Sequence, residues 1–285
     1  MGDSMENNSV AVIVAAGTGK RMGGTVKKQY LEIHGFPVLY FTLKAFEESN
    51  IDRIVIVTGK DEVDYVRREI VEKYGIKKVS RICAGGKERY DSVYEGLKNA
   101  AGNQKTTENE KATGDRKATG NDNMSENGST TGDKNVIGND NPTGDKKTSV
   151  PEYVLVHDGV RPFAGKELIN RMLDAVKEKK ACVVAVPAKD TIKEVIDGKI
   201  TKTFDRKLLY QIQTPQAFDY SLLLKAYEAM YLEKENGTAP EVTDDAMLIE
   251  HYSNQKVSIV PGDYRNIKIT TPEDLLFAEA IMGGL

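Results

Sequence analysis

The chain contains few cysteines, no excess of positive charge and no long apolar run. Its two cysteines, Cys83 and Cys182, are isolated, and each lies in or beside an apolar strand pattern, so they form no cysteine metal site. The formal net charge of −3 provides no basic footprint for nucleic acid. No apolar run approaches the ~20 residues of a membrane span, and the polar, acidic start is unlike a signal peptide. We therefore expect a cytoplasmic protein with buried free thiols that binds neither nucleic acid nor a membrane.

Two widespread phosphate-binding glycine motifs are also missing. A P-loop requires GxxxxGK[ST], but Met22 stands five residues after Gly17, where the second glycine is needed. The dinucleotide fingerprint GxGxxG is matched by Gly17 and Gly19 and fails at the same methionine. Both loops are therefore excluded.

A different segment, Val10–Leu31, is the most informative part of the sequence. Its β-branched run predicts a buried central strand, and the letters AAGTG that follow predict a tight turn whose backbone amides can close on an anion. Arg21 and Lys28 come after the turn and add positive charge. We interpret the segment as a triphosphate site; the alternative is a turn that simply needs small residues.

Strand and helix patterns alternate along the chain, which predicts an α/β fold. The predicted strands are Val10–Ala15, Arg53–Thr58, Lys78–Cys83, Tyr153–His157 and Ala181–Val186. The predicted helices are Val38–Glu48, Glu62–Tyr74, Arg89–Ala100 and Lys166–Lys179. Apolar strands in this rhythm favour a mostly parallel sheet with helices on both faces. Ligands bind beyond the carboxyl ends of such strands, where the glycine turn is expected.

Two segments depart from this alternation. Residues 190–206 alternate polar and apolar side chains around Asp197-Gly198, which predicts a β-hairpin that projects as an arm toward a partner subunit. Residues 101–150 have few large apolar side chains and are rich in Gly, Asn, Asp, Thr and Lys, so we expect a disordered insertion. Because this insertion joins a helix to a strand, we predict a single domain over residues 1–285.

An acidic residue ends the predicted strand in VLVHDGVRPF, Val154–Phe163. Asp158 is expected at the tip of a buried strand that faces the glycine turn, where Mg²⁺ bridging phosphates needs a carboxylate. The alternative role for Asp158 is a helix cap. We interpret the neighbouring His157 as a packed, hydrogen-bonded residue outside the mechanism.

Further polar clusters are expected at the same edge of the sheet. The letters GGKER, followed by Ser92, predict a turn and a helix start that either contacts a base or is an ordinary helix start. The short motifs DTIK, DR, QTPQ and VTDD carry groups that suit a polyol phosphate, or else cap helices and lie in solvent. Lys268 stands in a predicted short strand, Asn266–Thr270, where it needs an anion or must reach water.

Taken together, these motifs resemble the 2-C-methyl-D-erythritol 4-phosphate cytidylyltransferase family of the non-mevalonate isoprenoid pathway. The matching motifs are AAGxGxRM, KQY, GGxxRxDSV, VHDxxRP, DT-K, DR, QTPQ-F, TDD and NIK-TTPEDL, in the family's order from Val10 to about Met282. The resemblance implies a three-layer α/β/α Rossmann-like nucleotidyltransferase domain and a homodimer joined by the hairpin arm. It also implies CTP and a polyol phosphate as substrates, with Mg²⁺ as the divalent cation.

The resemblance assigns roles to individual residues. For catalysis it implies Arg21, Lys28, Arg206 and Lys268. Around the nucleotide it implies Ala15, Ala16, Gly17, Gly19, Gly86, Ser92 and Asp158, with Asp158 also at the metal. On the polyol phosphate it implies Thr191, Thr214, Thr243, Lys268 and Arg206, the last reaching across from the other subunit. Two positions depart from the family pattern: Lys27 replaces a common proline, which predicts a less rigid loop, and Lys87 replaces a frequent acidic residue.

The residue types fit the chemistry that the resemblance implies. A substrate phosphate oxygen, already anionic, attacks the α-phosphorus of CTP, so alignment and charge stabilisation are needed and a general base is not. Two other functions stay open: a ribitol 5-phosphate cytidylyltransferase of teichoic acid synthesis, and a catalytically idle homologue or interaction protein. The segment Thr203–Gln213 favours the methylerythritol phosphate enzyme over the ribitol 5-phosphate enzyme. The joint presence of Arg21, Lys28, Asp158, Arg206 and Lys268 disfavours the idle homologue or interaction protein.

Overall fold

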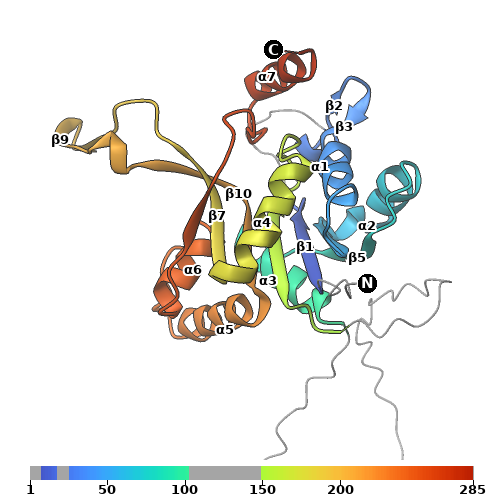
Figure 1. Cartoon of the computed structure of the whole chain (residues 1–285), viewed down its shortest axis with the longest axis horizontal. Helices are drawn as coiled ribbons and strands as arrows, with labels where there is room; N and C mark the ends of the chain where they lie inside the picture. The colour runs from blue at the N-terminus through green and yellow to red at the C-terminus, as the bar shows by residue number, and fades with distance from the viewer. Residues whose placement is uncertain (1–7, 18–25, 103–148, 285) are drawn as a thin grey trace, which may run out of the picture. The chain divides into compact units, whose positions relative to one another are not determined.

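Seven strands of the described residues form one mostly parallel sheet (Figure 1). The computed structural model describes residues 8–17, 26–102 and 149–284. In order across the sheet, the strands are β11 (Ser258–Pro261), β7 (Ala181–Pro187), β10 (Tyr210–Asp219), β6 (Tyr153–Asp158), β1 (Ser9–Val14), β4 (Arg53–Thr58) and β5 (Val79–Ala84). Neighbouring strands pair in parallel, except that β10 is antiparallel to both β7 and β6. The predicted α/β sheet is confirmed, and β10 and β11 are strands that the sequence patterns did not predict.

Helices cover both faces of the sheet. They are α1 (Val38–Glu47), α2 (Val63–Tyr65), α3 (Arg89–Ala100), α4 (Lys166–Lys179), α5 (Tyr220–Glu235) and α6 (Asp245–Tyr252), whereas α7 (Pro272–Met282) packs beside the small two-stranded sheet of β2 (Glu32–Ile33) and β3 (Phe36–Pro37). Because side chains alternate along a strand, Ala11 and Ile13 of β1 belong to one apolar cluster and Val10 and Val12 to the other. The two clusters give the three-layer arrangement that the resemblance implied.

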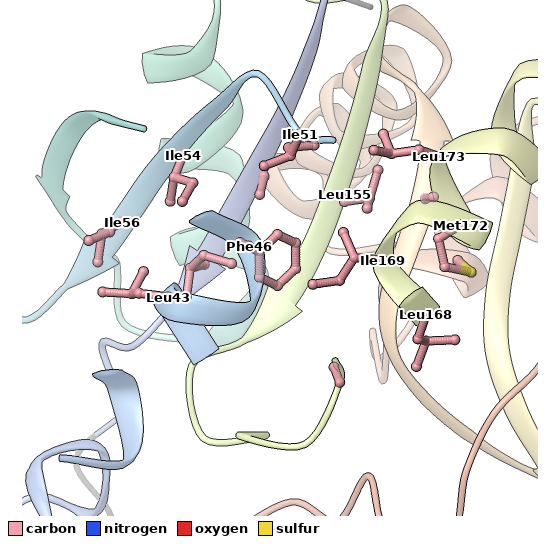
Figure 2. Packing of buried hydrophobic residues seen from close by; sticks show 14 of the residues in the cluster. Leu43, Phe46, Ile51, Ile54, Ile56, Leu155, Leu168, Ile169, Met172 and Leu173 are labelled. Atoms are coloured by element: carbon pink, nitrogen blue, oxygen red, sulfur yellow. The ribbon is translucent and has the colours of Figure 1, made fainter. Parts of the chain in front are cut away.

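One cluster lies between the sheet and helices α1 and α4. Figure 2 shows Phe46 of α1 and Ile169 of α4 beside Leu155 of β6 in this cluster. All three side chains are fully buried, and each such burial contributes about 1.5–3 kcal/mol by removing apolar surface from water. The opposite cluster contains residues of α3, α5 and α6, among them Leu97, Leu223 and Leu248.

Two local features differ from the predicted ones. The predicted helix Glu62–Tyr74 contains a π-helix, η4 (Val66–Glu72), whose C-terminal Lys73 N donates to Arg68 O five residues back. The segment 266–270 is an irregular loop rather than a strand. Instead of pairing with a strand, its backbone is bound to the turn after β6, where Val160 O accepts a hydrogen bond from Ile269 N at 2.9 Å.

The two cysteine thiols are both free, as predicted. Cys182 is buried, whereas Cys83 is only partly buried. None of the described helices is long and apolar enough to cross a membrane.

The hairpin predicted at residues 190–206 consists of β8 (Lys193–Ile196) and β9 (Lys199–Thr203). Its turn residues Asp197 and Gly198 have φ values of 49° and 75°, the positive angles that a two-residue hairpin turn requires. Every residue of both strands is exposed, and Figure 1 shows the hairpin standing away from the seven-stranded sheet. Residues 103–148 of the predicted insertion lie outside the described residues.

Candidate active site

The carboxyl ends of β1 and β6 meet at one edge of the sheet. In the register of these parallel strands, Val14 of β1 lies beside Asp158, the last residue of β6. The small residues 15–17 continue directly from β1. The predicted glycine turn and the predicted acidic strand end are therefore neighbours in the structure.

A pocket of about 440 Å³ opens at this edge, and we call it the first pocket. It is formed by the turn after β1, the short helix η2 (Lys28–Tyr30), the turn and first residues of α3, and the end of β6. The predicted site residues that it brings together are Ala15, Ala16, Gly17, Lys28, Gly86, Ser92, Asp158 and Lys268.

One hydrogen bond and one glycine shape the wall of the first pocket. The buried side chain of Gln29 donates from Nε2 to Ala15 O at 2.7 Å and so holds the turn. A Cβ atom at Gly85 would lie 2.6 Å from Ser92 Oγ and 2.7 Å from Ala16 Cβ, so only glycine allows this approach. The turn after β1 therefore packs directly against the start of α3.

Asp158 is the centre of a buried charge cluster. Its carboxylate lies 2.8 Å from Lys268 Nζ, 3.2 Å from Arg89 Nε and 3.7 Å from Arg161 Nε, and its side chain is 8% exposed. Burial alone would raise the pKa of this carboxyl, but the charges of Arg89, Lys268 and Arg161 outweigh burial and hold the pKa well below its ordinary value. Asp158 is therefore ionised at any physiological pH.

A second pocket, of about 480 Å³, shares three residues with the first. The shared residues are Arg89, Asp158 and Lys268. The other lining residues come from β10 and the start of α6, with Arg161; they are Ile212, Gln213, Thr214, Gln216, Thr243, Asp244, Met247 and Glu250. The charge cluster around Asp158 thus lies where the two pockets meet.

Thr214 links His157 to the backbone of Asp158. Thr214 Oγ1 accepts a hydrogen bond from Asp158 N at 3.1 Å and lies 2.9 Å from His157 Nδ1. His157 Nε2 lies 3.2 Å from Arg161 O, which fits a neutral ring protonated at Nε2. Burial lowers the pKa of His157 to about 4. His157 is thus the packed residue that we predicted, and the Thr214 hydroxyl is engaged within the protein.

Arg89 is a site residue that the sequence reasoning missed. Besides Asp158, it contacts Asp245, whose Oδ2 accepts from Arg89 Nη2 at 2.9 Å. Asp245 is fully buried and also accepts from Tyr227 Oη at 2.6 Å. Burial opposes the charge of Arg89, but Asp245 and Asp158 together raise the pKa of Arg89 well above its ordinary value. The available signal was an arginine in the first turn of a helix, where the helix dipole disfavours a cation.

The other predicted residues lie in three different places. Thr243 lines the second pocket. Thr191 and Arg206 are exposed at the two ends of the hairpin arm and line neither pocket. Gly19 and Arg21 lie outside the described residues.

The first pocket suits an anionic ligand. Its cationic residues are Lys28, Lys87, Arg89 and Lys268, and its acidic residues are Glu88 and Asp158. Across residues 8–17, 26–102 and 149–284, no group of three or more His, Cys, Asp and Glu side chains could hold a metal ion by itself. The arrangement can bind and align phosphates, and any metal here must take part of its oxygen ligands from them.

Comparisons with known proteins agree with one another. Residues 9–107 and 144–284 match the family model described as 2-C-methyl-D-erythritol 4-phosphate cytidylyltransferase (IspD). A protein of that name from Lachnoclostridium phytofermentans is 41% identical, with 95% of each chain covered. Another from Geobacter metallireducens is 41% identical over 95% of this chain and 96% of its own. The crystal structure of 4-diphosphocytidyl-2C-methyl-D-erythritol synthase from Anaerococcus prevotii is 32% identical, with a TM-score of 0.70 over 99% of this chain and 100% of that one.

Proposed function

Because this chain belongs to the 2-C-methyl-D-erythritol 4-phosphate cytidylyltransferase family, we propose that it transfers CMP from CTP to 2-C-methyl-D-erythritol 4-phosphate. The products are 4-diphosphocytidyl-2-C-methyl-D-erythritol and pyrophosphate, in the non-mevalonate synthesis of isoprenoid precursors. The observation in the structure that supports this reaction most is the pair of pockets that meet at Asp158, one for each phosphorylated substrate.

The reaction requires the enzyme to bring two anions together. An oxygen of the substrate phosphate forms a bond to the α-phosphorus of CTP, and the bond from that phosphorus to pyrophosphate breaks. The attacking oxygen is already an anion at neutral pH, so no side chain needs to remove a proton. Cationic groups reduce the repulsion and stabilise the charge that spreads over the phosphoryl oxygens and pyrophosphate.

We assign the first pocket to CTP and the second to the polyol phosphate. In the first pocket, the small residues of the turn after β1, with Gly86 and Ser92, leave room for the base, and Lys28 faces the phosphates. In the second pocket, Thr243 offers a hydroxyl and Arg161 a cation for the polyol phosphate. Lys268 lines both pockets and can contact either phosphate.

We propose that Asp158 also holds Mg²⁺ that arrives with CTP. A single carboxylate at the junction of the pockets fits this ion, because Mg²⁺ in such sites takes one or two carboxylates and completes its shell with phosphate oxygens and water. When bound, the ion would supply positive charge to the triphosphate. Arg89 and Lys268, which line both pockets beside Asp158, would contribute further positive charge to the same phosphates.

We propose a homodimer joined through the hairpin arm. Val195, Ile196 and Ile200 of the arm are 58%, 55% and 62% exposed, which suits a surface that a second copy covers. Thr191 and Arg206 stand at the two ends of the arm and line neither pocket of their own chain. In this proposal they complete the second pocket of the partner. We place the protein in the cytoplasm, where CTP is available and thiols stay reduced.

Pyrophosphate release with CTP and Mg²⁺ tests the function. We expect turnover with 2-C-methyl-D-erythritol 4-phosphate and none with ribitol 5-phosphate, which the family match does not favour. Turnover with ribitol 5-phosphate alone would keep the mechanism and reject the substrate. Failure with both in folded protein would reject the enzymatic function.

A further inference from the structure

The segment that carries Lys28 to the first pocket is bound to the sheet edge by the carboxylate of Glu62, in addition to the bond from Gln29 to Ala15 O and the contact of Tyr30 Oη with Thr58 Oγ1. Glu62 Oε1 lies 2.6 Å from Lys27 Nζ. Glu62 Oε2 accepts hydrogen bonds from Tyr30 Oη at 3.2 Å and from Gly59 N at 3.1 Å. Residues on both sides of Lys28 are therefore bound to the same group, just beyond the carboxyl end of β4.

The carboxylate of Glu62 is closely confined. Its side chain is 15% exposed, and Thr58 Oγ1 also donates to Oε2 at 3.2 Å. A Cβ atom at Gly59 would lie 2.7 Å from Glu62 Oε2 and 3.2 Å from Lys27 Nζ. Gly59 has an ordinary φ of −62°, so its backbone does not require glycine, but a side chain here would displace the Glu62 carboxylate from its present position.

We propose that Lys27 and Glu62 are positioning residues for cytidylyl transfer, which act by fixing the segment of residues 27–30 so that Lys28 points at the phosphates of CTP. Neither residue is among the described residues that line the two pockets, so both act through Lys28. The ion pair supplies the rigidity that a lysine in place of proline was expected to remove. This inference rests on the role proposed above for Lys28.

The backbone conformation of Lys27 allows an experiment that separates the effect of holding the segment in place from the effect of the Lys27 charge. Lys27 has a φ of −68°, within the range that a proline ring imposes. A proline at this position can therefore hold the backbone without any ion pair. Lys44 provides the matched control, because it forms an exposed 2.7 Å pair with Glu48 on α1, away from both pockets.

The experiment measures kcat, the KM for CTP and the thermal unfolding midpoint for Lys27→Met, Lys27→Pro and Lys44→Met. Since a small displacement of a catalytic group strongly lowers the rate, we expect Lys27→Met to lower kcat about tenfold in an enzyme that is still folded at the assay temperature, with a lower unfolding midpoint than Lys44→Met because Glu62 is less exposed than Glu48. We expect Lys27→Pro to recover kcat to within about twofold of the unaltered enzyme, because it restores the backbone constraint. Gly59→Ala displaces the Glu62 carboxylate but keeps the charges of Lys27 and Glu62, and we expect it to lower kcat as well.

Two results overturn the inference: a kcat for Lys27→Met equal to that of Lys44→Met, or a Lys27→Pro enzyme as slow as Lys27→Met. Lys28→Met, measured beside them, tests the premise separately. Normal turnover of Lys28→Met would reject the role proposed for Lys28. Loss of turnover there, with no effect at Lys27 and Gly59, would reject only the positioning inference.

Discussion

The edge of the sheet around Asp158 and the hairpin arm β8–β9 are both rich in charged residues, yet they differ in burial and in how their charges are paired. At the sheet edge two buried carboxylates are joined to partly exposed cations in a network, with Asp158 held by three cations and Asp245 by Arg89 and Tyr227. In the arm every residue of both strands is exposed, and its apolar side chains face solvent.

The difference shows what each region is built to do. A buried network fixes the direction of each charge, and fixed charges stabilise a reaction without having to reorganise. An exposed hairpin has little to hold its shape in the isolated chain, so its apolar side chains are useful only against another surface. This difference agrees with the two proposed roles, the sheet edge for binding the phosphates and the arm for the contact with a second copy.

The largest effect is expected at Lys28. Lys28→Met should keep the fold and lower kcat roughly a hundredfold or more, because a preorganised charge on the transferring phosphoryl group is lost. Pyrophosphate release measures the change. Lys202→Met on β9 is the matched control and should stay near the unaltered rate. Equal rates for the two variants would contradict the separation of the two regions.

The buried network should also dominate stability. Asp245→Asn leaves Arg89 with one charged partner fewer in a buried setting, and we expect it to lower the free energy of unfolding by about 3 kcal/mol. Asp263→Asn removes an exposed partner of Arg265 and should change it by less than about 1 kcal/mol. Urea unfolding of both variants provides the comparison. Similar losses of unfolding free energy in the two variants would show that burial does not determine how much each ion pair contributes to stability.

His157 should make the stability depend on pH. Its pKa is about 4 in the folded protein, because of burial, and about 6.5 in an unfolded chain. Between these values the unfolded chain binds one proton more than the folded protein, so stability falls as the pH falls from 6.5 to 4. We expect this residue to account for about 2–3 kcal/mol of the loss.

The comparison of the unaltered protein with His157→Gln isolates this contribution. The free energy of unfolding of each protein is measured at pH 7 and at pH 4.5. The variant should lose less stability over this interval than the unaltered protein. Equal losses would show that His157 does not titrate as its burial requires.

The smallest effect on stability is expected in the arm. Ile200→Thr should change the free energy of unfolding by less than about 0.5 kcal/mol, because Ile200 is 62% exposed. Sedimentation should nevertheless show weaker self-association, since the substitution removes apolar surface from the proposed dimer contact. Unchanged self-association would place the dimer contact elsewhere.

Much of the fold could be predicted because its physics is local. Strands β1, β4 and β6 are runs of β-branched or apolar residues, and the Asp197-Gly198 turn has its own sequence signal. Strand β10 lacks such a signal because several of its residues are polar and form tertiary hydrogen bonds. Gln213 bonds Asn266 there, Gln216 bonds Asp244, and Pro215 interrupts the ladder at a register shift.

The candidate site could be predicted only in part, for a related reason. The residues after β1 and at the end of β6 were found because parallel strands bring their carboxyl ends together. Arg89 was missed because its two partners lie 69 and 156 residues away in the chain. The commitment of the Thr214 hydroxyl to His157 and Asp158 is likewise a tertiary contact that the QTPQ letters do not show.

Thr243 tests most directly whether the two pockets that meet at Asp158 take the two substrates, because it lines only the second pocket. The measurement is the KM of Thr243→Val for each substrate in the pyrophosphate assay. Loss of one hydrogen bond should raise the KM for 2-C-methyl-D-erythritol 4-phosphate about fivefold and leave the KM for CTP unchanged. An equal or larger rise in the KM for CTP would contradict the assignment of the two pockets.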